Sequence, residues 1–99
     1  MIEEALEQAW GIISDQEPVE VGLRFAPAVA SRVAETTWHP TQVVQPEADG
    51  ALTWRATVSG TIEIRSWILS WGPDVEVLAP AELRAEVAGL VAAAAARYR

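Results

Sequence analysis

The chain has no cysteine, no lysine and a single histidine. Without cysteine there is no disulfide, no thiol nucleophile and no cysteine-based metal site. With His39 as the only histidine, metal sites built from two histidines are excluded and few ways remain to activate a nucleophile. No apolar run approaches the roughly 18 residues that a membrane span needs. We therefore expect no enzyme activity, no catalytic residues, no metal, no cofactor and no membrane insertion.

Positive charge is also scarce. The 99 residues carry seven basic side chains, all of them arginine, against 14 acidic ones, which gives a net charge of −7. A surface of this sign repels a phosphate backbone on average, so we expect no direct DNA binding by this chain alone. The acidic start, MIEEALEQAW, is the reverse of the basic start of a signal peptide, and a cytoplasmic protein is the simplest reading.

The chain does have the apolar content of a folded domain, with 51% hydrophobic residues in a length that suits one core. Residues 1–17 are expected to form a connector, in which IEEALEQAWGI has the apolar spacing of a helix and SDQEP reads as a loop. The domain itself then spans residues 18–99.

Alternating apolar and polar residues predict strands at 19–25 and 51–60, and Asp49-Gly50 is a strong turn signal just before the second of these. A weaker strand at 41–47 contains Pro46, which is typical of a short or edge strand. A further strand is expected at 74–80. Helices are expected at 28–35, at 62–71 with Thr61 as its cap and Gly72 after its end, and from 81 onward with a stripe of Leu83, Val87, Leu90 and Ala94.

This order predicts an α+β fold of the ferredoxin-like β-α-β-β-α-β kind. The expected architecture is an antiparallel sheet of four strands with two helices on one face, extended by extra N-terminal and C-terminal helices.

The chain contains five tryptophans, and their positions are the most informative feature for locating the core and a possible site. Trp67 and Trp71 share a helix face with Ile64 and Ile68, which indicates core packing. Trp38 lies in the loop TTWHPTQ, where both the edge of the core and an interface remain open. His39, beside it before a proline, is expected to be an exposed or capping residue rather than a general base. The candidate ligand or interface residues are Trp38, His39, Gln42, Trp54 and Arg55.

Several collinear blocks resemble the C-terminal extension, or WCX domain, of WYL-domain transcriptional regulators. They run from Pro18 to Tyr98 and read VEVGLRFAPAVASRVAE, WHPTQ, DGALTWRATVSG, IRSWILSWGPDVEVLAPAELRAEV and a closing ARY. In such bacterial regulators a winged-helix DNA-binding domain and an Sm-like WYL barrel precede the extension. The resemblance implies a ferredoxin-like fold that helps to hold protomers together and can border an effector site, and some members respond to single-stranded DNA.

The chain itself contains neither a winged helix nor a WYL barrel. We therefore expect a non-catalytic oligomerisation and regulatory module that forms a homodimer, with those two domains as partners if the chain is a fragment. The terminal helices IEEALEQAW and VAGLVAAAAARY carry more apolar surface than one small sheet can cover, which favours a dimer built through them. The alternative is an effector-sensing domain, in which Trp38, Trp54 and nearby arginines clamp a small anionic or nucleotide ligand.

Overall fold

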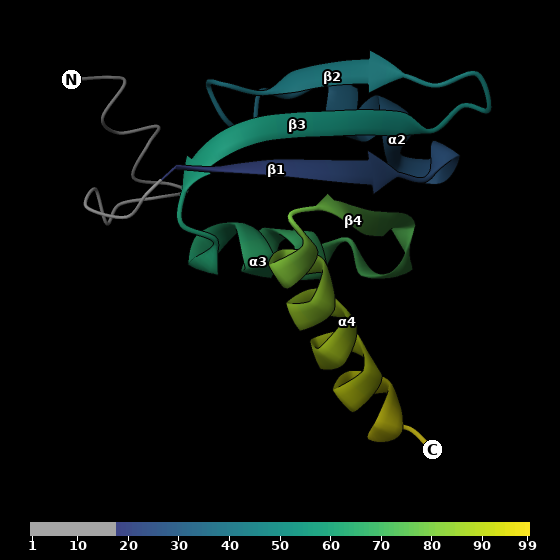
Figure 1. Ribbon diagram of the computed structural model, residues 1–99. Helices are drawn as coiled ribbons and strands as arrows, with labels where there is room; N and C mark the ends of the chain where they lie inside the picture. Colours follow the sequence, from purple (N-terminus) through teal and green to yellow (C-terminus); the bar gives the residue numbers. More distant parts are fainter. Residues whose placement is uncertain (1–17) are drawn as a thin grey trace.

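A computed structural model describes residues 18–99. The predictions made for residues 1–17, a connector helix and a loop, lie outside the described residues. Within this range the chain forms four strands and three α-helices, so the predicted α+β class is confirmed (Figure 1). The elements in chain order are β1 (Pro18–Phe25), α2 (Pro27–Ala34), β2 (Val43–Pro46), β3 (Leu52–Ser59), α3 (Ile62–Ser70), the 3₁₀ turn η1 (Gly72–Asp74), β4 (Val75–Ala79) and α4 (Ala81–Ala96).

The four strands form one sheet in the order β2-β3-β1-β4, and every neighbouring pair is antiparallel, as predicted. Since β1 and β2 are both antiparallel to β3, they run parallel to each other, and α2 connects them. In the same way β3 and β4 are both antiparallel to β1, and α3 connects them. The sheet is therefore made of two interleaved β-α-β units.

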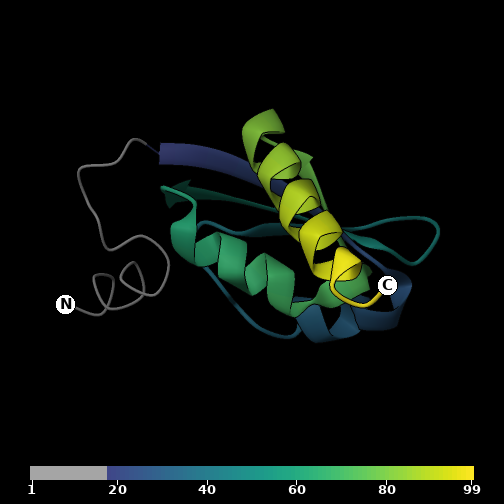
Figure 2. The same ribbon diagram turned by 90° about the horizontal axis from the view of Figure 1, so that it is seen from below.

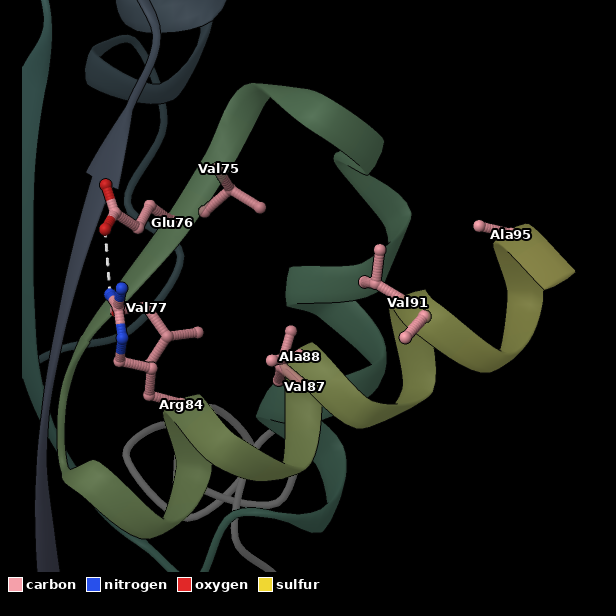
Figure 3. Close-up of a pocket in the computed structure, with 9 residues that line it drawn as sticks. Val75, Glu76, Val77, Arg84, Val87, Ala88, Val91 and Ala95 are labelled. Carbon is pink, nitrogen blue, oxygen red and sulfur yellow. Dashed lines mark hydrogen bonds and ion pairs between the residues drawn. The ribbon is translucent and has the colours of Figure 1, made fainter.

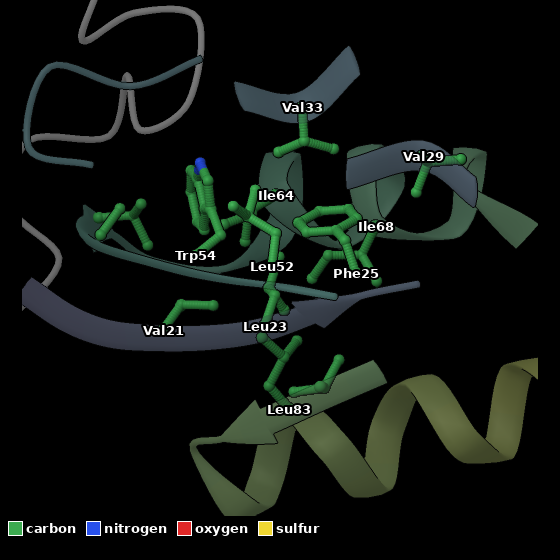
Figure 4. Close-up of a cluster of buried hydrophobic side chains, with 13 residues drawn as sticks. Val21, Leu23, Phe25, Val29, Val33, Leu52, Trp54, Ile64, Ile68 and Leu83 are labelled. Carbon is green, nitrogen blue, oxygen red and sulfur yellow. The ribbon is translucent and has the colours of Figure 1, made fainter. Parts of the chain in front are cut away.

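The buried face of the sheet carries the alternate apolar residues that predicted the two long strands. Leu23 of β1 pairs with Trp54 of β3, and Phe25 pairs with Leu52, so these side chains point to the same face. Val29 and Val33 of α2 and Ile64 and Ile68 of α3 belong to the same buried cluster (Figure 4). Both helices therefore cover one face of the sheet, as expected (Figure 2).

The opposite face of the sheet is mostly polar, although Val43, which pairs with Arg55, is exposed on it. Glu20, Arg55 and Thr57 are exposed there, and Arg24 forms an ion pair with Asp49 of the β2–β3 turn. Such a face can remain in contact with water, as the alternating sequence predicted.

Local backbone chemistry sets the ends of α3. Gly72 follows the helix with φ +61°, a left-handed conformation that costs a residue with a Cβ about 1–2 kcal/mol, and Pro73 prevents further helix. The predicted stop is thus confirmed. Thr61 stands at the N-cap position as predicted, but its side chain makes no capping hydrogen bond, so the predicted cap interaction is wrong.

The last helix, α4, begins against the body of the domain and then projects away from the sheet (Figure 1). None of the helices described between residues 18 and 99 combines the length and the apolar character needed to cross a membrane.

Candidate functional site

The projecting part of α4 carries exposed apolar side chains. Leu83 is buried and Val87 is partly buried against the core, so the first two turns of the helix pack on the domain. One turn further, Leu90 is 41% exposed and Val91 is 51% exposed. The predicted stripe of Leu83, Val87, Leu90 and Ala94 therefore exists, but its second half is only partly covered by the body of the domain.

Two grooves flank the projecting half of α4. The first, the β4 groove, has a volume of about 380 Å³ and runs between Val75 and Val77 of the strand and Val87, Ala88 and Val91 of the helix (Figure 3). The second, the α3 groove, has a volume of about 650 Å³, and its walls are the end of α3 with η1 on one side and α4 on the other. Its lining is apolar along its whole length, consisting of Ile68, Leu69, Gly72, Pro73, Val75, Val87, Leu90, Val91, Ala94 and Ala95.

Polar contacts hold the base of α4 in place. Arg84 donates to the Glu76 carboxylate and to the backbone carbonyl of Val77, both at 2.8 Å, which ties α4 to β4. Arg65 of α3 forms an ion pair with Glu86. The helix is thus fixed on two sides at its N-terminal end, while its C-terminal turns have no such tether among the described residues.

Four of the five residues singled out in the sequence come together elsewhere, at the edge of the core beyond α2. Gln42 is their centre, because its Oε1 accepts hydrogen bonds from the backbone N–H groups of Trp38 and His39, at 2.7 and 3.2 Å. The same oxygen accepts from Nε1 of Trp54 at 3.1 Å. The group therefore fastens the α2–β2 loop to the sheet.

Arg55, the fifth candidate, does not join this group. It follows Trp54 in β3, and successive side chains of a strand point to opposite faces. Trp54 is fully buried under the helices, whereas Arg55 is exposed on the polar face. The five residues therefore do not line one common site.

His39 was expected in an exposed or capping position, and the exposed reading is wrong because only 6% of the residue is accessible. Its Nδ1 accepts the backbone N–H of Thr41 at 3.2 Å and lies 2.9 Å from the Thr41 hydroxyl. That hydroxyl also accepts the backbone N–H of Thr57 at 2.8 Å. The imidazole therefore caps the turn of the loop and helps to link it to β3.

Trp38 lies at the edge of the core, where it packs against other aromatic rings. Its ring lies 5.3 Å from that of Trp67 and 6.0 Å from that of Trp71, measured between centroids. Its Nε1 donates to the carbonyl of Val33 at 3.2 Å. Trp67 also lies 5.1 Å from Trp54 and 5.7 Å from Phe25, so the aromatic rings form one packed cluster, as the helical spacing of Trp67 and Trp71 predicted.

Within residues 18–99, no group of three histidine, aspartate or glutamate side chains is placed so that it could hold a metal ion.

Sequence reasoning found the apolar excess of α4 but missed the other walls of the grooves. Leu69 and Pro73 line the α3 groove, and Arg84 holds the strand beside the β4 groove. Leu69 carried one usable signal, since it falls outside the face shared by Ile64, Trp67, Ile68 and Trp71. The partners of Arg84 depend on how α4 folds back on β4, which no local pattern specifies.

Together these features define a small α+β domain whose last helix projects from a sheet covered on one face. The family model of the WCX domain matches residues 17–95. The chain therefore belongs to the WCX domain family, as the resemblance predicted. A search of curated proteins found no match to the chain.

Proposed function

We propose that this domain is a non-catalytic oligomerisation and regulatory module of a WYL-type bacterial transcription regulator. Membership of the WCX family supports the link to such regulators. In such a protein its partners within the chain would be a WYL barrel and a winged helix, and it would act in the cytoplasm. We also propose that the domain has a ferredoxin-like fold. The two interleaved β-α-β units and the strand order β2-β3-β1-β4 support this assignment.

The exposed apolar half of α4 is the observation that carries the oligomerisation role. Burying a leucine or valine side chain is worth about 1.5–3 kcal/mol, and Leu90 and Val91 are still close to half exposed beside two apolar grooves. Contiguous exposed apolar surface of this kind marks an interaction site more often than an accident of folding. A second protein surface would complete the burial that α4 begins.

DNA contact by this domain is not part of the proposal. Arg24, Arg65 and Arg84 are each paired with a carboxylate of the domain. The remaining described arginines lie on different elements, namely Arg32 in α2, Arg55 in β3, and Arg97 and Arg99 after α4. They form no basic stripe that could follow a phosphate backbone.

The alternative, an effector clamp of Trp38, Trp54 and arginine, receives less support. Trp54 has no exposed surface on which a base could stack, and its Nε1 is engaged by Gln42. Arg55 points away from both rings, to the other face of the sheet. An effector that used these residues would have to open the core edge first.

Sedimentation velocity on the isolated chain, over a micromolar concentration series, tests the proposal. We expect a concentration-dependent dimer that Leu90→Asp converts to monomer without unfolding, because a charge would enter the buried patch. Leu78→Asp is the matched control, since Leu78 is 42% exposed, against 41% for Leu90, and lines neither groove. A strict monomer, or equal effects of the two variants, would contradict the assignment of the interface to α4.

A further inference from the structure

The two ends of the α3 groove differ in charge. At one end, Glu86 comes directly before Val87, the first α4 residue of the lining, and its carboxylate is paired with Arg65 of α3. At the other end, Arg97 follows the lining residue Ala94 and keeps helical backbone angles, φ −69° and ψ −19°. Arg97 forms no ion pair with any described residue. The groove therefore runs from a neutralised pair of charges to an unpaired positive one.

Arg97 lies on the side of α4 that faces this groove. It comes seven residues after Leu90 and three after Ala94, which both line the groove, and residues at this spacing share one helix face. The stem of an arginine packs along apolar surface while its guanidinium stays in water, so Arg97 can reach over the end of the lining. Asp74, next to Pro73 on the opposite wall, is not paired with Arg97 and leaves its charge in place.

The lining between the two ends has the chemistry of a saturated hydrocarbon. It contains aliphatic side chains, glycine and proline, and no aromatic or polar side chain, so a ring finds no partner for stacking and a sugar finds no side-chain hydrogen bond. From Val87 to Ala95 the groove follows α4 for roughly 12 Å at 1.5 Å per residue, about the length of an extended chain of ten carbons. Its volume of about 650 Å³ is in the range of small-molecule sites, roughly 300–1,000 Å³.

From these features we propose that the α3 groove binds the alkyl chain of a medium-chain carboxylate of about ten carbons, with the head group beside Arg97. Both walls belong to one chain, so the site is complete in a single copy, and an alkyl chain is thin enough to lie between two helices that already face each other. The inference goes beyond the oligomerisation role and does not rest on it. It adds a ligand that would change the surface of α4, since Leu90 lines the same groove.

A series of carboxylates of increasing length, titrated into the full chain by calorimetry below their micelle concentrations, tests the fit. Burial of each added CH₂ should tighten binding about four-fold, so the dissociation constant should fall about 16-fold from octanoate to decanoate. It should stop falling near dodecanoate, where the chain outgrows the groove. Affinity that does not depend on length, or that keeps rising through hexadecanoate, would overturn the site.

Two tryptophan substitutions test the location. Ala94→Trp should abolish decanoate binding because the indole fills the groove, whereas Ala93→Trp is the matched control, exposed on α4 and lining neither groove. Should Ala94→Trp fold poorly, methyl NMR of the unmodified chain gives the same answer. Decanoate should shift the methyl signals of Leu69 and Leu90, which line the groove, and not those of Leu78, which does not. Equal shifts at all three leucines would contradict the proposed location.

The head group is tested by charge. Arg97→Glu should weaken decanoate binding several-fold at low salt and leave the binding of neutral decanol unchanged, because an exposed ion pair contributes only modestly. Arg32→Glu, on an exposed position of α2, should change neither. Decylammonium should bind the unmodified chain more weakly than decanoate, and equal or tighter binding would overturn the role of Arg97.

Sedimentation of the same samples separates this inference from the oligomerisation role. A chain that binds decanoate as described but stays monomeric at every concentration would overturn the oligomerisation role alone. A dimer that does not bind decanoate would overturn the ligand site alone.

Discussion

Replacement of Gln42 by methionine tests whether one side chain fixes the loop at the core edge. The change keeps the length of the side chain and removes its amide. It deletes the hydrogen bonds from Trp38 N, His39 N and Trp54 Nε1 to Oε1, and the exposed one from Nε2 to the carbonyl of Thr36 at 3.2 Å. Each net bond is worth about 0.5–1.5 kcal/mol, and the exposed one contributes least, so we expect a loss of roughly 2–4 kcal/mol.

Urea denaturation followed by tryptophan fluorescence measures this loss, and an unchanged m-value would show that the folded and unfolded states keep their compactness. Gln45→Met is the matched control. Gln45 is an exposed glutamine of β2, and a surface change of this kind should stay within about 0.5 kcal/mol.

A double-mutant cycle with Trp54→Phe isolates the share carried by the indole. We expect a coupling free energy of about 0.5–1.5 kcal/mol between Gln42 and Trp54. A Gln42→Met variant as stable as the Gln45→Met control would refute the central role of Gln42. A coupling of zero would refute only its bond to the indole.

Three further predictions use the same denaturation assay. Trp67→Ala should lower the free energy of unfolding by about 3–5 kcal/mol because it empties the centre of the aromatic cluster. Trp71→Phe should leave stability unchanged or raise it, since Nε1 of Trp71 is buried without an acceptor in the described structure, and a large loss of stability would contradict this. His39→Ala should cost about 1–2 kcal/mol because the turn loses its buried cap, whereas the exposed position considered from the sequence would make the change silent. A variant as stable as the wild type would contradict a role of the imidazole in fixing the loop. Gly72→Ala should lower stability by about 1–2 kcal/mol because Gly72 has a positive φ. Gly89→Ala should raise stability by up to about 1 kcal/mol, because Gly89 lies in a helix interior where an added Cβ meets nothing within 4 Å. Equal effects at both glycines would contradict this conformational argument.

The sheet and its covering helices were predictable because their signals are local. Leu23 and Phe25 alternate with polar residues, and Ile64 and Ile68 recur at helical spacing. The buried face of each element can therefore be predicted from the residues of that element alone. The same period should have separated Trp54 from Arg55, which are neighbours in a strand and therefore cannot line one site.

The rest depended on contacts between distant segments. Helical periodicity gives the direction of the stripe that includes Leu90 and Ala94, but it does not show whether the body of the domain extends far enough to cover these side chains. His39 looked exposed because a residue before proline in a loop has no periodic neighbour to indicate burial. Its burial arises from Thr41, whose hydroxyl bonds both to the ring and to β3.

The hydrogen bond from Arg84 to the carbonyl of Val77 has a consequence for crowded solutions. β4 and β2 are the outer strands of the sheet, and outer strands are where chains add to one another and start fibres. On β4 a charged guanidinium already occupies a backbone carbonyl. On β2 the strand is short and ends at Pro46, which has no N–H to offer an incoming strand. Both outer strands are thus poor templates for the edge-to-edge addition of a strand from another chain.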